Sequence, residues 1–134
     1  AAPAYLKRHG RPSSPQELES GQHMCIDFRD SQTGRPFAWE FHRPGEKLIV
    51  RTDGRLVIND ASTLYSACEH GHAVAQMLDL GLEPALKAGT LVELFPDWPN
   101  ERFPLYAFYP SRHLPAAKVR AFLEFVSELS STTR

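Results

Sequence analysis

The segment formed by residues 55–71, RLVINDASTLYSACEHG, most constrains what this chain can fold into. Residues 56–58 are apolar at every position, which is typical of a strand buried on both faces inside a helix-covered sheet. From Ala61 onwards, apolar side chains recur along one helical face. The segment therefore predicts a buried strand that leads into a helix through the polar pair Asn59 and Asp60.

Apolar runs and turn signals divide the rest of the chain into short elements. They predict further strands at residues 24–28, 37–42, 47–51, 73–77, 91–95 and 103–109. They also predict short helices at residues 3–9, 14–19 and 84–88 and an amphipathic helix at residues 115–129. The order strand, helix, strand, helix, strand from residue 56 to residue 95 implies parallel pairing with right-handed crossovers. The chain is therefore predicted to be an α/β protein with a mixed, mainly parallel sheet flanked by helices.

Composition excludes several classes of protein. The 134 residues suffice for about one domain. Lys plus Arg number 15 against 16 Asp plus Glu, so no basic surface is expected to bind nucleic acid. Without a signal-like or membrane-spanning apolar run, the chain is predicted to be cytoplasmic and free of membrane contact. The first residue is Ala1 rather than methionine, and we expect further sequence upstream of it.

A set of short motifs points to a known family through its order and spacing. The motifs cover nearly the whole chain and comprise residues 1–6 (AAPAYL), 23–26 (HMCI), 39–41 (WEF), 56–71, 89–92 (GTLV), 95–98 (FPDW), 105–113 (LYAFYPSRH) and 118–122 (KVRAF). In this order, the chain resembles the C-terminal part of the effector-binding domain of LysR-type transcriptional regulators.

The resemblance implies a type II periplasmic-binding-protein-like fold, in which two α/β lobes hold a small effector in the cleft between them. It implies that residues 1–101 form the second lobe, and that residues 102–134 form a crossing strand and the terminal helix of the first lobe. The front half of that lobe and the N-terminal helix-turn-helix would be absent from this chain. The family also implies a homodimer or homotetramer that binds DNA only through the helix-turn-helix.

The first candidate effector site is the predicted helix start, formed by Asn59, Asp60, Ala61, Ser62 and Thr63. Unpaired backbone N–H groups and the helix dipole make such a turn attractive to an anion. The alternative is that Asn59 or Asp60 only caps the helix. Because Asp60 would repel an anion, we expect contacts through backbone N–H groups, Ser62 or Thr63.

Two further candidate sites lie later in the chain. Ligands of doubly wound sheets bind beyond the carboxyl ends of parallel strands, which selects Gln76 and Met77 at the end of the predicted strand 73–77. Phe103 and Tyr106 on the crossing strand could face the cleft, although core packing is the usual role of aromatic residues in an apolar run.

Catalytic and metal chemistry are not expected. Cys68, His70 and His72 are clustered, but residues two apart on a helix do not share a face, so no metal site is predicted. Cys25 lies in an apolar run, where a thiol behaves as a small apolar side chain rather than a redox switch. No nucleophile elbow or catalytic carboxylate pair is present, so neither enzymatic activity nor a cofactor is predicted.

Three functions are compatible with these patterns. The first is the ligand-sensing and oligomerisation part of a LysR-type regulator, with a small acidic or aromatic effector. The second is a solute-binding module used in transport, which would require a secretory signal. The third is a structural dimerisation domain without ligand, in which the predicted helix 61–70, with Tyr65 and Glu69, contacts a second copy.

Overall fold

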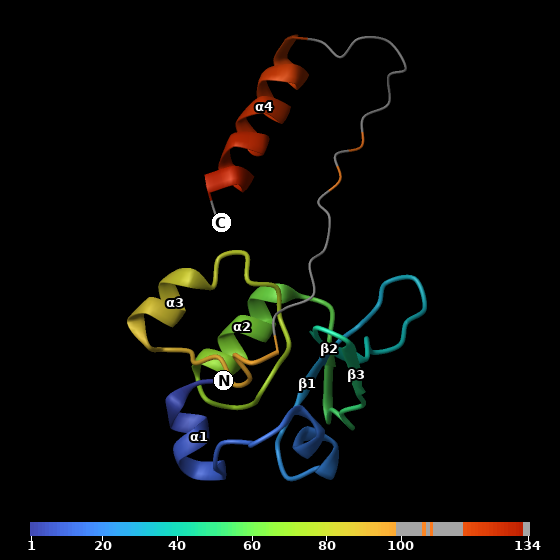
Figure 1. Ribbon diagram of the computed structural model, residues 1–134, viewed down its shortest axis with the longest axis vertical. Helices are drawn as coiled ribbons and strands as arrows, with labels where there is room; N and C mark the ends of the chain where they lie inside the picture. Colours follow the sequence, from blue (N-terminus) through green and yellow to red (C-terminus); the bar gives the residue numbers. More distant parts are fainter. Residues whose placement is uncertain (99–105, 107, 109–116, 133–134) are drawn as a thin grey trace. The chain divides into compact units, whose positions relative to one another are not determined.

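The computed structural model describes residues 1–98, 106, 108 and 117–132 (Figure 1). It divides the chain into two compact units, Ala1–Glu101 and Arg102–Arg134. The division falls where the motifs place a boundary between two lobes, but the assignment of each unit to a lobe stays a prediction.

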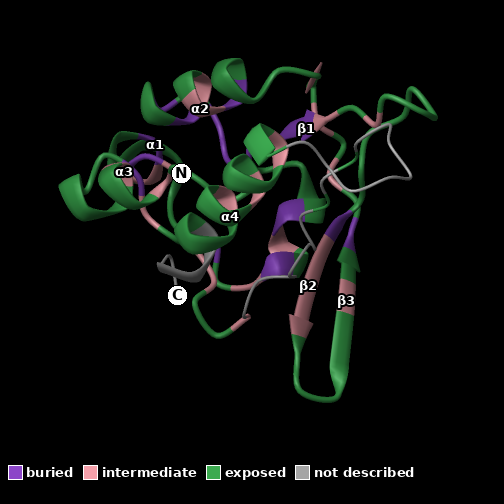
Figure 2. Ribbon diagram, turned by 90° about the horizontal axis from the view of Figure 1, so that it is seen from above, coloured by how far each residue is buried: buried purple, intermediate pink, exposed green. Residues whose placement is uncertain are grey.

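The first unit contains three α-helices, one 3₁₀ helix and four strands within its described residues. In chain order they are α1 (Pro3–His9), η1 (Pro15–Ser20), β1 (Ile26–Phe28), β2 (Trp39–Arg43), β3 (Glu46–Val50), β4 (Leu56–Ile58), α2 (Ala61–Glu69) and α3 (Glu83–Ala88). Figures 1 and 2 place α1, α2 and α3 on one side of β1 and the β2–β3 hairpin on the other.

A small parallel sheet lies at the centre of this unit. β1 pairs in parallel with β4, so that Asp27 lies opposite Val57. On its other side, Cys25 forms a parallel bridge with Val74, whose N–H donates to the carbonyl oxygen of Met24 at 2.8 Å. We call residues 73–77, which include Val74, the Val74 segment. Because α2 connects β4 to the Val74 segment, the predicted strand–helix–strand crossover is present around β1.

The parallel sheet is smaller than predicted. Residues 73–77 contribute the single bridge at Val74, and residues 91–95 form no strand. Val92 exchanges two backbone hydrogen bonds with Ala1 (2.9 and 3.2 Å), but one residue pair does not make a ladder. The prediction that residues 56–58 are buried on both faces was also wrong. Leu56 is 46% exposed, because β4 is an edge strand in the described part of the chain.

The β2–β3 hairpin is antiparallel, and its turn at Pro44 and Gly45 was predicted correctly. Gly45 has a φ of 78°, a conformation that glycine adopts without strain. Trp39 and Val50 face each other at the end away from the turn, where both are buried (Figure 2). The hairpin is therefore fixed at one end and exposed at the other.

The short helices lie where local sequence signals predicted them, although the capping residue of the second helix differs by one position. α1 begins at Pro3 and ends before Gly10, as predicted. The second helix is a 3₁₀ helix, and the predicted capping box is displaced by one residue. The carboxylate of Glu17 accepts hydrogen bonds from the backbone N–H (2.7 Å) and hydroxyl (2.8 Å) of Ser13, whereas the Ser14 side chain makes no capping bond.

Apolar packing joins the elements into one core with satellite clusters. The largest cluster contains Tyr5, Leu18, Trp39 and Val50, together with Cys25 and Val74 beside β1. Leu64 of α2 packs with Ile26 and Ala73, which holds α2 against β1. The buried carboxylate of Asp27 accepts hydrogen bonds from the Thr52 hydroxyl and from the Gly54 N–H (3.2 Å), so that β1 also fixes the segment before β4.

The second unit contains α4 (Ala117–Thr132), which confirms the predicted amphipathic helix. Val119, Leu123 and Val126 are half-buried along one face. Most of the predicted strand 103–109, including Phe103, lies outside the described residues, as does the predicted helix start at Pro115. Within the described residues, no helix has both the length and the apolar character needed to cross a membrane.

Candidate functional site

The start of α2 is closed by its own side chains. Asp60 is the N-cap, and its carboxylate accepts hydrogen bonds from the Thr63 N–H (2.7 Å), the Thr63 hydroxyl (2.6 Å) and the Ser62 hydroxyl (2.8 Å). These bonds, above all the one from the Thr63 hydroxyl, lower the pKa of Asp60 to about 2. The capping interpretation is therefore confirmed, and a negative charge already occupies the anion-friendly end of the helix.

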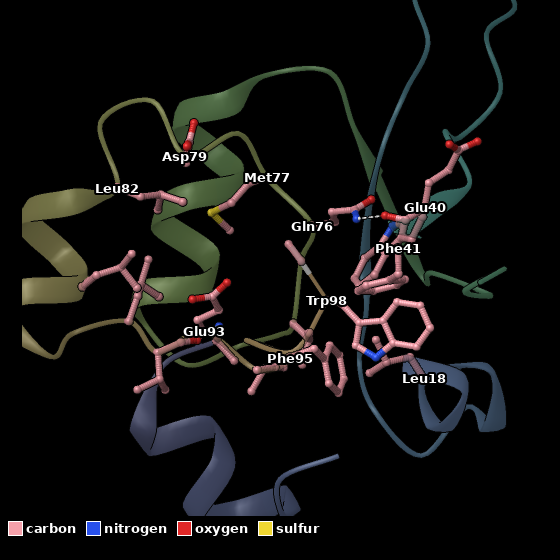
Figure 3. A pocket seen from close by; sticks show the side chains of 18 residues that line it. Leu18, Glu40, Phe41, Gln76, Met77, Asp79, Leu82, Glu93, Phe95 and Trp98 are labelled. Carbon is pink, nitrogen blue, oxygen red and sulfur yellow. Dashed lines mark hydrogen bonds between the residues drawn. The ribbon is translucent and has the colours of Figure 1, made fainter. Parts of the chain in front are cut away.

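A cavity of about 180 Å³ lies elsewhere in the first unit, beyond the carboxyl end of the Val74 segment (Figure 3). Gln76 and Met77, two of the predicted site residues, line it, whereas residues 59–63 do not. Figure 3 shows Met77 and Leu82 on one side of the cavity and Phe41 and Trp98 on the other. The structure thus brings the second predicted site into a cavity and leaves the first on the exposed surface.

Gln76 connects the cavity wall to the hairpin. Its side-chain Nε2 donates a hydrogen bond to the backbone oxygen of Glu40 at 2.8 Å, drawn as a dashed line in Figure 3. The Val74 segment, which contains Gln76, is itself bonded to β1. Gln76 therefore fixes the distance between β2 and the end of the central parallel segment.

Aromatic rings form one wall of the cavity. The ring of Phe41 meets Phe95 edge-on at a centroid distance of 5.6 Å and meets Trp98 edge-on at 6.3 Å. The guanidinium of Arg43 lies over the Trp98 ring, 4.3 Å from its centroid, and pairs with Glu46 at 2.7 Å. This wall is apolar, and a cation already stacks on its outer ring.

Three carboxyl groups belong to residues that line the cavity: Glu40, Asp79 and Glu93. The Glu40 carboxylate accepts from Lys47 (2.7 Å) and His42 (3.2 Å), and the Lys47 hydrogen bond is the main cause of its lowered pKa. In Figure 3 the Glu40 carboxylate extends away from the cavity, whereas that of Glu93 is directed into it. Glu93 is therefore the acidic group best placed to contact a ligand.

A hydrogen-bonded loop borders the cavity next to α2. The hydroxyl of Tyr65 donates to the backbone oxygens of Leu78 (3.3 Å) and Leu80 (3.0 Å). Asp79 lies between these two residues, and Leu82 follows at the start of α3. The position of Tyr65 on α2 thus determines where the loop that carries Asp79 can lie.

Of the remaining sequence candidates, Tyr106 belongs to the second unit, and Cys25 and Cys68 belong to the first. Tyr106 is 69% exposed and its ring lies beside Phe108, so it is not a core residue, and Phe103 falls outside the described residues. Cys25 and Cys68 are buried, and burial raises the pKa of their thiols to about 12 and about 11. Neither is therefore a reactive thiolate near neutral pH. Within the described residues, no three His, Cys, Asp or Glu side chains are grouped closely enough to hold a metal ion.

Sequence reasoning missed Glu93, Phe95 and Trp98. Glu93 and Phe95 lie within the predicted strand 91–95, and Trp98 lies within the turn-rich residues 96–100. Polar and apolar residues do not alternate regularly in either segment, so the sequence does not show which way these side chains point. The tryptophan after a Pro-Asp pair was a usable signal, because a large aromatic residue in a turn needs a partner surface. Its partner, Phe41, lies 57 positions earlier and could not be identified from spacing.

Comparisons with known proteins place the chain in a family. A family model described as LysR substrate binding domain matches residues 1–131. The chain is 30% identical over 126 residues to the uncharacterized HTH-type transcriptional regulator YcaN of Escherichia coli, covering 94% of this chain and 40% of that protein. It is also 30% identical over 128 residues to the HTH-type transcriptional regulator PtxR of Pseudomonas aeruginosa, covering 96% and 40%. The chain thus spans about two fifths of the length of these curated relatives.

A solved structure supports the same fold. The regulatory domain of CrgA, a LysR-type transcriptional regulator from Neisseria meningitidis, matches with a TM-score of 0.71 at 24% identity, covering 96% of this chain and 61% of that one. The prediction of an α/β, periplasmic-binding-protein-like fold is confirmed at this level, with small mixed sheets flanked by helices. The family is non-enzymatic, which confirms the prediction that the chain is not an enzyme. The resemblance inferred from the motifs is likewise confirmed: the chain belongs to the LysR substrate binding domain family.

Proposed function

We propose that this chain is the ligand-sensing part of a LysR-type regulator and that a small organic effector binds in the cavity lined by Gln76, Met77 and Glu93. The cavity itself is the observation that carries the proposal. It lies beyond the carboxyl end of a parallel segment, where α/β folds place their ligands, and it combines apolar walls with a few polar groups.

The size of the cavity limits what this unit alone can hold. Its volume of about 180 Å³ is below the roughly 300–1,000 Å³ of typical ligand pockets. A ligand of one ring with a short substituent fits this volume, and a larger effector would place only one of its ends here.

The start of α2 remains a second candidate contact for the effector. The hydroxyls of Ser62 and Thr63 donate to Asp60, so only their lone pairs are available to a ligand. An effector at this position would have to offer a hydrogen-bond donor and tolerate the Asp60 carboxylate. For this reason we rank residues 59–63 behind Gln76 and Met77.

Partners of the full-length protein are proposed from the family. The chain matches the family model of the LysR substrate binding domain. Its relatives YcaN and PtxR are named as HTH-type transcriptional regulators. We propose that the full-length protein assembles as a homodimer or homotetramer and contacts DNA through a segment outside this chain. Effector binding would then change the arrangement of the subunits.

A thermal-shift screen of small acids, amines and neutral aromatic compounds tests the cavity directly. For any compound that raises the melting temperature of the 134-residue chain, we expect the Met77→Arg substitution to abolish the shift. The longer, charged side chain would extend from an apolar wall into the space that the ligand needs. A chain carrying Ser62→Ala and Thr63→Ala is the control and should keep the shift. If the control loses the shift while Met77→Arg keeps it, the effector binds at the start of α2 and the cavity proposal is wrong.

A further inference from the structure

The ionisable side chains that line the cavity are all acidic. Glu40, Asp79 and Glu93 are its ionisable side chains, and no Lys, Arg or His side chain is among the lining residues. The amino group of Ala1 also lies at the wall, where it donates to the carbonyl oxygen of Val92 at 3.2 Å. A ligand carboxylate placed here would therefore face negative charge without a cationic side chain to balance it.

The three carboxylates do not contribute equally. Glu40 is already paired with Lys47 and His42, and its carboxylate extends away from the cavity. Asp79 lies on the loop at the rim, and Glu93 is directed into the cavity (Figure 3). Within the described residues, neither Asp79 nor Glu93 forms an ion pair. The amino group of Ala1 at the wall carries at most one positive charge, and burial lowers its pKa, so it does not balance both carboxylates.

The neighbouring guanidinium does not neutralise Glu93. Arg11 donates to the backbone oxygens of Glu93 (2.7 Å) and Leu94 (3.2 Å), and it is not a lining residue. Its donors thus hold the main chain in place from outside the cavity. The carboxylate of Glu93 remains available on the inner side.

The aromatic wall favours the same kind of ligand. Phe41, Phe95 and Trp98 form the wall across the cavity from Glu93 (Figure 3), and their rings meet edge-on. The guanidinium of Arg43, which is not a lining residue, already stacks on Trp98. Aromatic rings together with a carboxylate are the groups that recognise an ammonium ion attached to an apolar body.

From this arrangement we infer that the cavity takes a small apolar or aromatic amine in its cationic form, with the ammonium group at Glu93 and the apolar body against Phe41, Phe95 and Met77. The inference rests on the proposed function, since it names the ligand class of the same cavity. It departs from the acidic effector that the start of α2 suggested.

Three matched probes of one ring each separate charge from shape. At pH 7 benzylamine is a cation, benzyl alcohol is neutral and benzoate is an anion, and the three differ little in size. We expect titrations of the 134-residue chain, followed by NMR chemical shifts, to rank their affinities as benzylamine, then benzyl alcohol, then benzoate.

The Glu93→Gln substitution then assigns the charge preference to one residue. We expect it to weaken benzylamine binding by about tenfold and to leave benzyl alcohol unchanged, because only the charged hydrogen bond is lost. Glu124→Gln on α4 changes the net charge equally and should have no effect on either probe. Glu93 is exposed, so the melting temperature of the variant should stay close to that of the parent chain.

Different results overturn different claims. If benzoate binds in the cavity as tightly as benzylamine, or if Glu93→Gln leaves benzylamine binding unchanged, the amine preference is wrong while the proposed effector cavity stands. If none of the three probes shifts the resonances of cavity residues, the proposed cavity fails, and the amine inference fails with it.

Discussion

At the scale of single residues, Asp60 shows how one side chain decides between two uses of a helix start. The sequence allowed either a cap or an anion site, and the carboxylate accepts three hydrogen bonds that leave no free donor among the side chains beside it. Glu93 shows the opposite case. Its carboxylate has no partner among the described residues and is directed into a cavity.

Asp60 should make the stability of the chain depend on acid pH. Its pKa is about 2 in the folded chain against an ordinary value of 3.8, so its stabilising effect is complete above about pH 4. That effect is lost as the pH falls through about 2, where the folded carboxylate takes up a proton. We therefore expect Asp60→Ala to melt several degrees lower than the parent chain at pH 6, and the difference to disappear near pH 2.

Thermal melts followed by circular dichroism between pH 2 and pH 6 provide the measurement. Asp60→Asn is the matched variant, because its side-chain oxygen still accepts the Thr63 N–H but does not titrate. It should keep most of the stability at every pH. A melting difference for Asp60→Ala that is the same at pH 2 and pH 6 would show that the carboxylate charge plays no part.

At the scale of elements, the sequence predicted the ends of helices, which depend on nearby residues, better than the pairing of strands. Pro3 and Gly10 bound α1, and Gly89 ends α3 with a φ of 72°, since these signals act within a few residues. The strands predicted at residues 73–77 and 91–95 depend on partners far away in the chain. Each segment pairs with a distant backbone through only one of its own residues, Val74 or Val92, so an apolar run was insufficient to predict a strand there.

Helix α2 has a second task that its sequence did not reveal. Tyr65, which the sequence suggested as a contact with a second copy, uses its hydroxyl to hold the 78–80 loop at the cavity. Glu69 likewise accepts a hydrogen bond from Thr90 at 3.4 Å. Self-association through α2 remains a proposal, and a loss of self-association in a Tyr65 variant would not by itself distinguish a lost interface from a displaced loop.

Tyr65→Phe should loosen the loop without unfolding the unit. The substitution removes one hydroxyl and leaves the ring that packs beside Cys68 and Leu91 in place. We expect faster amide hydrogen exchange at residues 78–82 and an unchanged rate in β1. Tyr106→Phe, which removes an exposed hydroxyl in the other unit, is the control. Equal exchange rates in Tyr65→Phe and the parent chain would mean that the loop is held by other contacts.

At the scale of the whole molecule, motif order identified the family, and geometry identified the cavity. The motifs are spread along nearly the whole chain, so their order and spacing alone were enough to indicate the family. The cavity wall comes from β2, the end of the Val74 segment and the turn at Trp98, which meet only in the folded chain. Gln76 and Met77 could be predicted because ligands of α/β sheets bind beyond the carboxyl ends of parallel strands. No such general rule points to Glu93.

The most direct test of the effector cavity uses the methionine methyl groups. The chain contains two methionines, of which Met77 lines the effector cavity and Met24 lies on a separate surface pocket. With methyl-labelled methionine and alanine and with benzylamine as the probe, we predict nuclear Overhauser effects between the ring protons and the Met77 methyl group, and none to Met24. Effects from a bound probe to the methyl group of Ala61 at the start of α2, with none to Met77, would contradict the account.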